Sequence, residues 1–149
     1  MTDIVKFRWK KLCTFLIALA TYYPSLSQSF VWTGKEHSAT IGLFTSILED
    51  KNDRFTIAEI GNSVNLNRFS PLHRTSLHFG FTNSTYWVRF ELRNQTKNSL
   101  LLELDQAFLE SVNLYYRDSS LPRKEILSGY KMRLKNKPII DHLQLFPLP

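Results

Sequence analysis

The sequence contains very little cysteine and glycine. Its 149 residues include one cysteine, Cys13, and 5 glycines. Because Cys13 lies in an apolar stretch near the N-terminus, the rest of the chain cannot form an internal disulfide and must be stabilised by packing. The chain after this stretch also lacks a glycine-rich loop that could bind phosphate, a Gly-x-Ser-x-Gly nucleophile elbow and a cysteine nucleophile. We therefore predict that the protein is not an enzyme and has no cofactor and no catalytic residues.

A hydrophobic run long enough to cross a membrane is also missing. The uncharged apolar stretch Leu12–Ala20 is well below the ~20 residues that a spanning helix needs. Pro24 follows it, and small residues stand at alternate positions around Ser27. The stretch is preceded by a group of basic residues, namely Lys6, Arg8, Lys10 and Lys11. This order predicts a signal peptide over residues 1–27 and an exported domain over residues 28–149.

A strong basic excess disappears once the predicted signal peptide is removed. That segment holds four of the 19 basic residues and one of the 13 acidic residues, which leaves a net charge of +3. Nucleic-acid binding thereby loses its main support. Four basic residues alternate near the C-terminus, namely Lys131, Arg133, Lys135 and Lys137. Their spacing favours the solvated face of a strand, and a patch for an anionic ligand is the alternative.

Short segments with strand periodicity make up most of the remaining chain. The clearest runs from Thr85 to Arg93, where apolar residues occupy every second position. Further extended segments are predicted at 42–48, 77–81, 100–104, 111–116, 126–134 and 139–146. Short strands separated by turns are typical of a β-sandwich or barrel, and we find no internal repeat and no interdomain linker. We therefore predict a single all-β domain.

One short helix is predicted between these strands. Thr56 and Glu59 have the spacing of a capping box. Ile57, Ile60 and Val64 follow at helical spacing, which places them on one face.

The polar face of the Thr85–Arg93 segment carries the candidate ligand-binding residues Trp87, Arg89, Glu91 and Arg93. Trp87 and Arg89 are two residues apart, so the guanidinium can lie near the indole as a cation–π pair. An aromatic ring beside polar groups suits a sugar, because the ring stacks on C–H faces while the polar groups bind hydroxyls. A structural ladder of side chains across neighbouring strands is the alternative.

Metal binding has little support in the sequence. Asp50, Asn52 and Asp53 place oxygen ligands in one polar turn, which makes them weak calcium candidates. They lack the residue order of an EF-hand loop. The four histidines are too dispersed for a helix-borne zinc signature, so no metal is predicted.

Several segments, in their order along the chain, resemble a known family. They are Ile47–Asp50, Phe69–Leu72, Leu77–Phe81, Tyr86–Phe90, Leu92–Asn94, Leu102–Leu104, Ser111–Tyr115, Ser128–Tyr130 and Phe146–Leu148. Residues 38–148 as a whole are similar to the second extracellular sensor domain of bacterial seven-transmembrane receptors with diverse intracellular signalling modules. The resemblance implies a jelly-roll-like β-sandwich, similar to a carbohydrate-binding module, on the periplasmic side of the membrane.

The function that this resemblance implies is sensing. We expect a periplasmic ligand-binding domain whose favoured ligand is a small carbohydrate, and a protein–protein interaction module without a small ligand is the alternative. Full-length relatives are expected to add a seven-helix membrane domain and a cytoplasmic output module, neither of which occurs in this sequence. Because a jelly roll has about eight strands and about seven segments are found, we also expect a sandwich that is truncated at its C-terminus.

Overall fold

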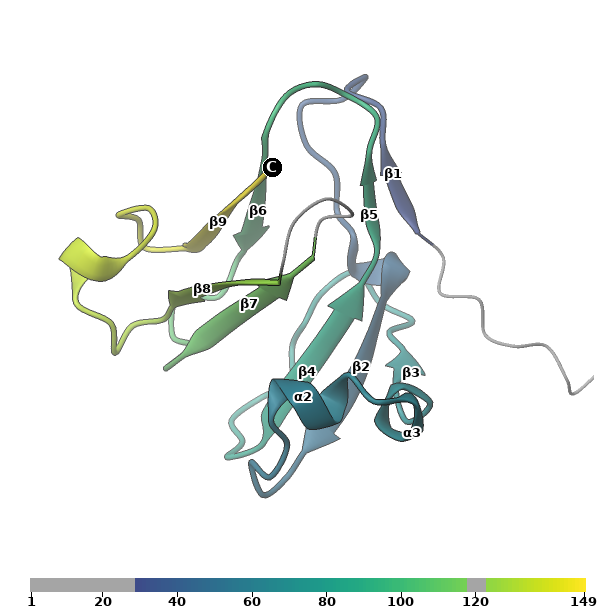
Figure 1. Ribbon diagram of the computed structural model, residues 1–149. Helices are drawn as coiled ribbons and strands as arrows, with labels where there is room; N and C mark the ends of the chain where they lie inside the picture. The colour runs from purple at the N-terminus through teal and green to yellow at the C-terminus, as the bar shows by residue number, and fades with distance from the viewer. Residues whose placement is uncertain (1–28, 118–122) are drawn as a thin grey trace, which may run out of the picture. The chain divides into compact units, whose positions relative to one another are not determined.

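The computed structural model describes residues 29–117 and 123–149 (Figure 1). The predicted signal peptide and Cys13 lie outside the described residues. The structure is 34% strand and 12% helix, which confirms the all-β class. In the described part of the chain, no helix is long and apolar enough to cross a membrane. The chain divides after Gln95 into two compact units, each of which has its own buried residues.

The first unit is built on a three-stranded antiparallel sheet. Its central strand β2 (Thr45–Asp50) lies between β3 (Ser70–Pro71) and β4 (Thr85–Phe90) (Figure 1). Strand β2 has the apolar residues that a central strand needs, and Leu48 is buried opposite Trp87 of β4. Pro71 fits the short outer strand because an edge position does not require its missing N–H.

A second pairing in this unit joins residues that are distant in sequence. Strand β1 (Phe30–Trp32) runs parallel to β5 (Leu92–Asn94). The 3₁₀ turn η1 (Gly42–Phe44) precedes β2, and the ring of Phe44 packs edge-on against Phe30 with 5.2 Å between the ring centroids. This aromatic contact links the turn before β2 to β1.

Two one-turn helices replace the predicted single helix. The helix α2 (Ile57–Ile60) begins with the predicted capping box, in which Glu59 and Thr56 exchange hydrogen bonds. It ends at Gly61, and Asn62 caps a new helix, α3 (Ser63–Leu66), through a 2.9 Å bond from the Asn65 N–H. The second cap resets the helical phase, so Ile60 is buried while Val64 is 71% exposed. The prediction that Ile57, Ile60 and Val64 share one face of a single helix was wrong.

The predicted strand at 77–81 is also absent. Its residues form no ladder, and Gly80 has a positive φ of 69° that interrupts an extended chain. Phe79 instead stacks on Tyr86 of β4 with 3.9 Å between the ring centroids, while Phe81 is fully exposed. This segment therefore contacts β4 through the stacking of Phe79 on Tyr86, whereas the alternation of apolar residues predicted pairing through backbone hydrogen bonds.

The second unit contains two antiparallel strand pairs. Strand β6 (Leu100–Leu104) pairs with β9 (Gln144–Leu148), and β7 (Val112–Tyr116) pairs with β8 (Lys124–Ser128) (Figure 1). The buried apolar side chains of this unit all belong to β9, namely Leu145, Phe146 and Leu148, and buried Gln144 lies on the same strand. The predicted segments at 100–104 and 111–116 are therefore strands in the structure, as expected.

The last two predicted strands have different limits in the structure. Strand β8 ends at Ser128, because Gly129 turns the chain with a φ of 126°. Residues 129–137 then form turns and the 3₁₀ helix η2 (Leu134–Asn136), and β9 starts only at Gln144. The alternating cations from Lys131 to Lys137 consequently do not form one face of a strand, and that prediction was wrong.

Candidate functional site

Trp87 is a packed residue of the first unit. It is half-buried on the sheet face that it shares with Leu48 and Asp50, both of which are buried. Its indole nitrogen is buried too, and the indole interacts with the Asp50 carboxylate. Trp87 shares this face with Arg89, and on the opposite face Val88 is 37% exposed, so both faces of β4 are partly open to solvent. A ring packed in this way offers little surface for a sugar to stack on.

The four predicted binding residues do not share one sheet. Trp87 and Arg89 belong to β4, which pairs with β2, whereas Arg93 belongs to β5, which pairs with β1. Glu91 lies between the two strands, and its carbonyl accepts a 2.8 Å hydrogen bond from the Phe30 N–H. Arg89, Glu91 and Arg93 are exposed. These four residues therefore belong to two different ladders and to the position between them.

The weak calcium candidates form a closed turn. The Asp50 carboxylate accepts a 2.9 Å hydrogen bond from the Phe55 N–H. Burial alone would raise the pKa of Asp50, but hydrogen bonds from the N–H groups of Phe55, Arg54 and Asn52 and from Trp87 outweigh it and lower the pKa. Asp53 has a φ of 50° and accepts a 2.9 Å bond from the Thr85 hydroxyl. The Asp50 carboxylate thus binds the turn, and the Asp53 carboxylate binds the first residue of β4. No cluster of three metal-binding side chains occurs in the described ranges.

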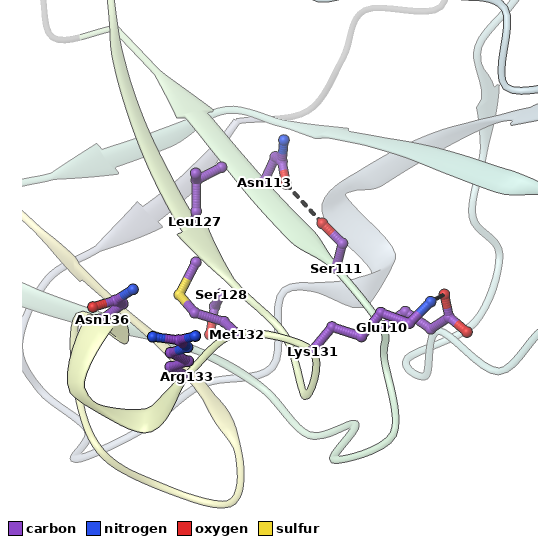
Figure 2. Close-up of a pocket in the computed structure, with 9 residues that line it drawn as sticks. All are labelled: Glu110, Ser111, Asn113, Leu127, Ser128, Lys131, Met132, Arg133 and Asn136. Atoms are coloured by element: carbon purple, nitrogen blue, oxygen red, sulfur yellow. Dashed lines mark hydrogen bonds and ion pairs between the residues drawn. The ribbon is translucent and has the colours of Figure 1, made fainter.

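An open hollow lies in the second unit, beside the β7–β8 hairpin and the η2 turn (Figure 2). It has a volume of about 420 Å³. Its lining combines polar, charged and apolar side chains, namely Glu110, Ser111, Asn113, Leu127, Ser128, Lys131, Met132, Arg133 and Asn136. Figure 2 shows Asn113 on the strand, Ser111 directly before it, and Arg133 and Asn136 in the η2 segment. The hollow is widely open to solvent, so it is a depression of the surface and not an enclosed pocket.

Hydrogen bonds between side chains fix the strand wall of this hollow. The Ser111 hydroxyl donates to Asn113 Oδ1 at 3.1 Å, as the dashed line in Figure 2 shows, and Asn113 Nδ2 donates to the Tyr115 hydroxyl at 3.2 Å. Ser111 directly precedes β7, and Asn113 and Tyr115 lie on it, so the three residues are two apart along an extended segment and lie on one face. The bond from Asn113 lowers the pKa of Tyr115, but burial and the neighbouring Glu125 carboxylate outweigh it and raise the pKa. The Tyr115 hydroxyl therefore stays protonated while its oxygen accepts the bond from Asn113.

An ion pair forms another part of the wall. Lys131 Nζ pairs with Glu110, which also accepts a 3.2 Å bond from the Tyr130 hydroxyl. The hydrogen bond and the charge of Lys131 lower the pKa of Glu110. Backbone bonds from Tyr130 N–H to Leu109 and from Lys131 N–H to Glu110 continue the strand pairing past Gly129. The backbone therefore positions the ion pair.

A buried glutamine anchors the end of β8 next to this wall. Gln144 of β9 is fully buried, and its Oε1 accepts bonds from the Ser128 hydroxyl at 2.6 Å and from the Gly129 N–H at 3.0 Å. Buried polar groups need such partners, so Gln144 fixes the point at which the chain leaves β8. The loop that carries Lys131 and Arg133 starts from this fixed point.

The relationship to known proteins follows the same segments. The sequence profile described as 7TMR-DISM extracellular 2 matches residues 42–149, well over half of the chain. The chain belongs to this family. The predicted resemblance is thereby confirmed. Comparisons with curated proteins and with solved structures gave no match.

Membership of the 7TMR-DISM extracellular 2 family gives the chain a role of a general kind. The family is the extracellular sensor domain of seven-transmembrane receptors, which supports a periplasmic sensor role in bacteria. It is a receptor module and not a catalytic domain. In full-length proteins such a domain is associated with a seven-helix membrane domain. The matched residues include all nine that line the hollow.

The hollow of this 7TMR-DISM extracellular 2 domain was not predicted from the sequence. Two signals pointed to it. Ser111, Asn113 and Tyr115 alternate with apolar residues on β7, and the spaced cations after Tyr130 had an anionic-ligand patch as the alternative interpretation. The sequence could not show that the turn at Gly129 brings Lys131 and Arg133 beside β7. That arrangement depends on backbone pairing between segments that are distant in the sequence.

Proposed function

We propose that this chain is the ligand-binding sensor domain of a bacterial membrane receptor, that it acts on the periplasmic side, and that it binds a small carbohydrate in the hollow beside β7. The observation that carries this proposal is the fixed row of polar side chains on one wall of the hollow. Leu127 and Met132 add apolar surface in the same hollow. Sugar sites combine these two features, because hydroxyls need oriented polar partners and C–H faces need apolar contact.

Binding would act on the receptor by shifting a conformational equilibrium. A ligand that prefers one conformation of the domain stabilises it, and the seven-helix membrane domain and cytoplasmic output module of full-length relatives would respond to that shift. The ligand itself is not transformed in this scheme. NMR spectra of the ligand before and after prolonged incubation with the protein should therefore be identical.

A thermal-shift screen of the purified chain against sugars, amino acids and anions tests the ligand. A ligand at 100 times its dissociation constant adds about 2.7 kcal/mol of stability, which gives a readily measured rise in melting temperature. We expect a carbohydrate to give this rise, and we expect Asn113→Ala, which removes the centre of the polar row, to reduce it while Arg89→Ala and Arg93→Ala retain it. A screen without a stabilising compound would overturn the proposed ligand-binding function.

The Arg89 and Arg93 variants also separate the two candidate sites. If they lose the ligand-induced rise while Asn113→Ala keeps it, the site lies on the face of Trp87, Arg89, Glu91 and Arg93 that the sequence predicted. The melting temperature of each variant without ligand serves as the control for folding. Arg89, Arg93 and Asn113 are exposed, so their replacement should leave the fold intact.

A protein-interaction module is the second candidate, and exposed aromatic rings favour it. Phe81 in the first unit is fully exposed, and Phe108 in the second unit is 89% exposed. Exposed aromatic side chains are common in protein interfaces. Pull-down from a periplasmic extract, with the ligand-free chain as bait, tests this candidate. Capture of the same partner by the wild type and by a Phe81→Ser/Phe108→Ser variant would exclude these rings as the contact.

A further inference from the structure

The free hydrogen-bonding groups of the hollow are mostly donors. Both oxygens of Glu110 are engaged, one by the Tyr130 hydroxyl and the other by Lys131. Asn113 spends its amide hydrogens on Tyr115 and Glu125, at 3.2 Å and 3.4 Å. Lys131 has three N–H groups and gives one to Glu110, which leaves two. The strongest acceptors are therefore occupied while strong donors remain.

Arg133 adds the largest set of unused donors. Its side chain makes no hydrogen bond or ion pair with any residue in the described ranges, and neither does the side chain of Asn136. Arg133 precedes η2 and its carbonyl accepts a 2.9 Å bond from the Asn136 N–H. In a 3₁₀ turn, residues three apart lie on the same side. Arg133 and Asn136 therefore line the hollow together, as Figure 2 shows.

The charge of the hollow has the same sign as these free donors. Lys131 and Arg133 are its cations and Glu110 is its only anion among the lining residues. Because Lys131 and Glu110 neutralise each other, the charge of Arg133 is left uncompensated. A guanidinium matches a carboxylate in shape, since two parallel N–H groups can bind its two oxygens.

We infer that the ligand of this hollow carries a carboxylate, and that its class is a uronic-acid sugar bound through Arg133. This inference rests on the proposed function, because the hydroxyl-bearing part of the ligand comes from the carbohydrate proposal. Arg133 takes the carboxylate, while Asn136 and the remaining N–H groups of Lys131 take ring hydroxyls. Leu127 and Met132 contact the C–H face of the sugar ring. The anionic-ligand patch that the spacing of the cations allowed thus has a structural basis in Lys131 and Arg133.

Titration calorimetry on the whole chain tests the inference with three groups of compounds. The first is glucuronate and galacturonate, the second is the matched neutral sugars glucose and galactose, and the third is acetate and phosphate. We expect the uronates to bind at least about ten-fold more tightly than the neutral sugars, which is the size of one charge-assisted hydrogen bond. Added salt should weaken uronate binding and leave neutral sugars unaffected.

Two variants assign the effect to Arg133. Arg133→Gln removes the charge and should abolish the preference for uronates. Lys124→Gln removes an equal charge from β8 but outside the hollow, where Lys124 lies opposite Tyr116, and should keep the preference. Equal loss in both variants would indicate a general effect of net charge and would overturn the inference.

The remaining outcomes separate this inference from the proposed function. Tight binding of neutral sugars, with Arg133→Gln unchanged, would overturn the inference and support the proposed function. Equal binding of uronates, acetate and phosphate would show a general anion site and would overturn the assignment to a sugar acid. Failure of every sugar to bind would overturn the inference together with the carbohydrate ligand.

Discussion

At the scale of single residues, the side chains that attract attention in the sequence are used for folding. Asp50 is 4% exposed and accepts hydrogen bonds from the backbone of the turn that follows it. Trp87 packs on the same face as Asp50 and Leu48. A tryptophan or an aspartate can therefore bind a ligand or stabilise the fold, and its burial and its hydrogen-bond partners show which of the two it does. Arg133, in contrast, is exposed, and its side chain has no hydrogen-bond partner among the described residues.

Asp50→Asn should change how stability depends on pH. The pKa of Asp50 is lowered from its ordinary value of 3.8, so its carboxylate stabilises the fold fully above pH 3.8 and loses this contribution as the pH falls through the lower folded value. The variant should therefore be less stable than the wild type near pH 7, and the difference should shrink below pH 3.8. Urea unfolding between pH 2.5 and 7 measures this, with exposed Asp105→Asn as the control. A constant difference at every pH would contradict the prediction.

At the scale of elements, backbone exceptions explain where periodicity misleads. The segments at 100–104 and 111–116 follow their alternation because no residue in them needs an unusual φ. Alternation fails at 77–81 and after Ser128, where Gly80 and Gly129 have positive φ values. The sequence does not show whether a glycine has a positive or a negative φ, so these two interruptions were not predicted. The single helix predicted behind Thr56 is divided into two, because Asn62 caps a new helix, although an asparagine at this position could equally have been an ordinary helical residue.

Two glycine substitutions test this account. Gly129 has a φ of 126°, and a Cβ there would lie 2.4 Å from the Glu110 carbonyl oxygen, which is backbone and cannot move aside. Gly80 also has a positive φ, 69°, but a Cβ there would meet nothing within 4 Å. Gly80→Ala should cost roughly 1–2 kcal/mol, the usual penalty of a left-handed residue. Gly129→Ala should cost clearly more, because a steric clash adds to the strain.

Denaturant unfolding of the two alanine variants provides the measurement. Gly129→Ala should also weaken binding in the hollow, since Lys131 and Arg133 follow this turn directly. Gly80→Ala should leave that binding unchanged. Equal loss of stability in the two variants would show that the close approach of Gly129 to Glu110 contributes nothing.

At the scale of the whole molecule, the chain has two groups of buried side chains that belong to different units. Leu48, Ile60 and Leu72 are buried in the first unit, and Leu145, Phe146 and Leu148 are buried in the second. Both candidate sites lie within a single unit: the predicted Trp87 face in the first and the hollow in the second. The folding of each site therefore depends on its own group of buried residues.

Core truncations should consequently act locally. Phe146 is 1% exposed, and Phe146→Ala should cost about 3–5 kcal/mol and lower hydrogen-exchange protection in β6 and β9 first. Leu48→Ala, at about 2–5 kcal/mol, should lower protection in β2 and β4 first. Amide exchange followed by mass spectrometry resolves the two regions. Equal loss of protection in both regions in either variant would show that the units unfold together.

The sequence by itself determined the all-β class, most strands, the Thr56 capping box and the family, because these depend on local periodicity, on nearby residues and on the order of segments. Only the tertiary structure shows the hollow and the pairing of the Trp87 segment. Strands β4 and β5 pair with different strands, which the continuous alternation from Thr85 to Arg93 does not reveal. The hollow arose because Gly129, anchored by Gln144 from β9, turns Lys131 and Arg133 toward β7. Contacts between residues far apart in sequence set both results, and such contacts leave no periodic pattern in the chain.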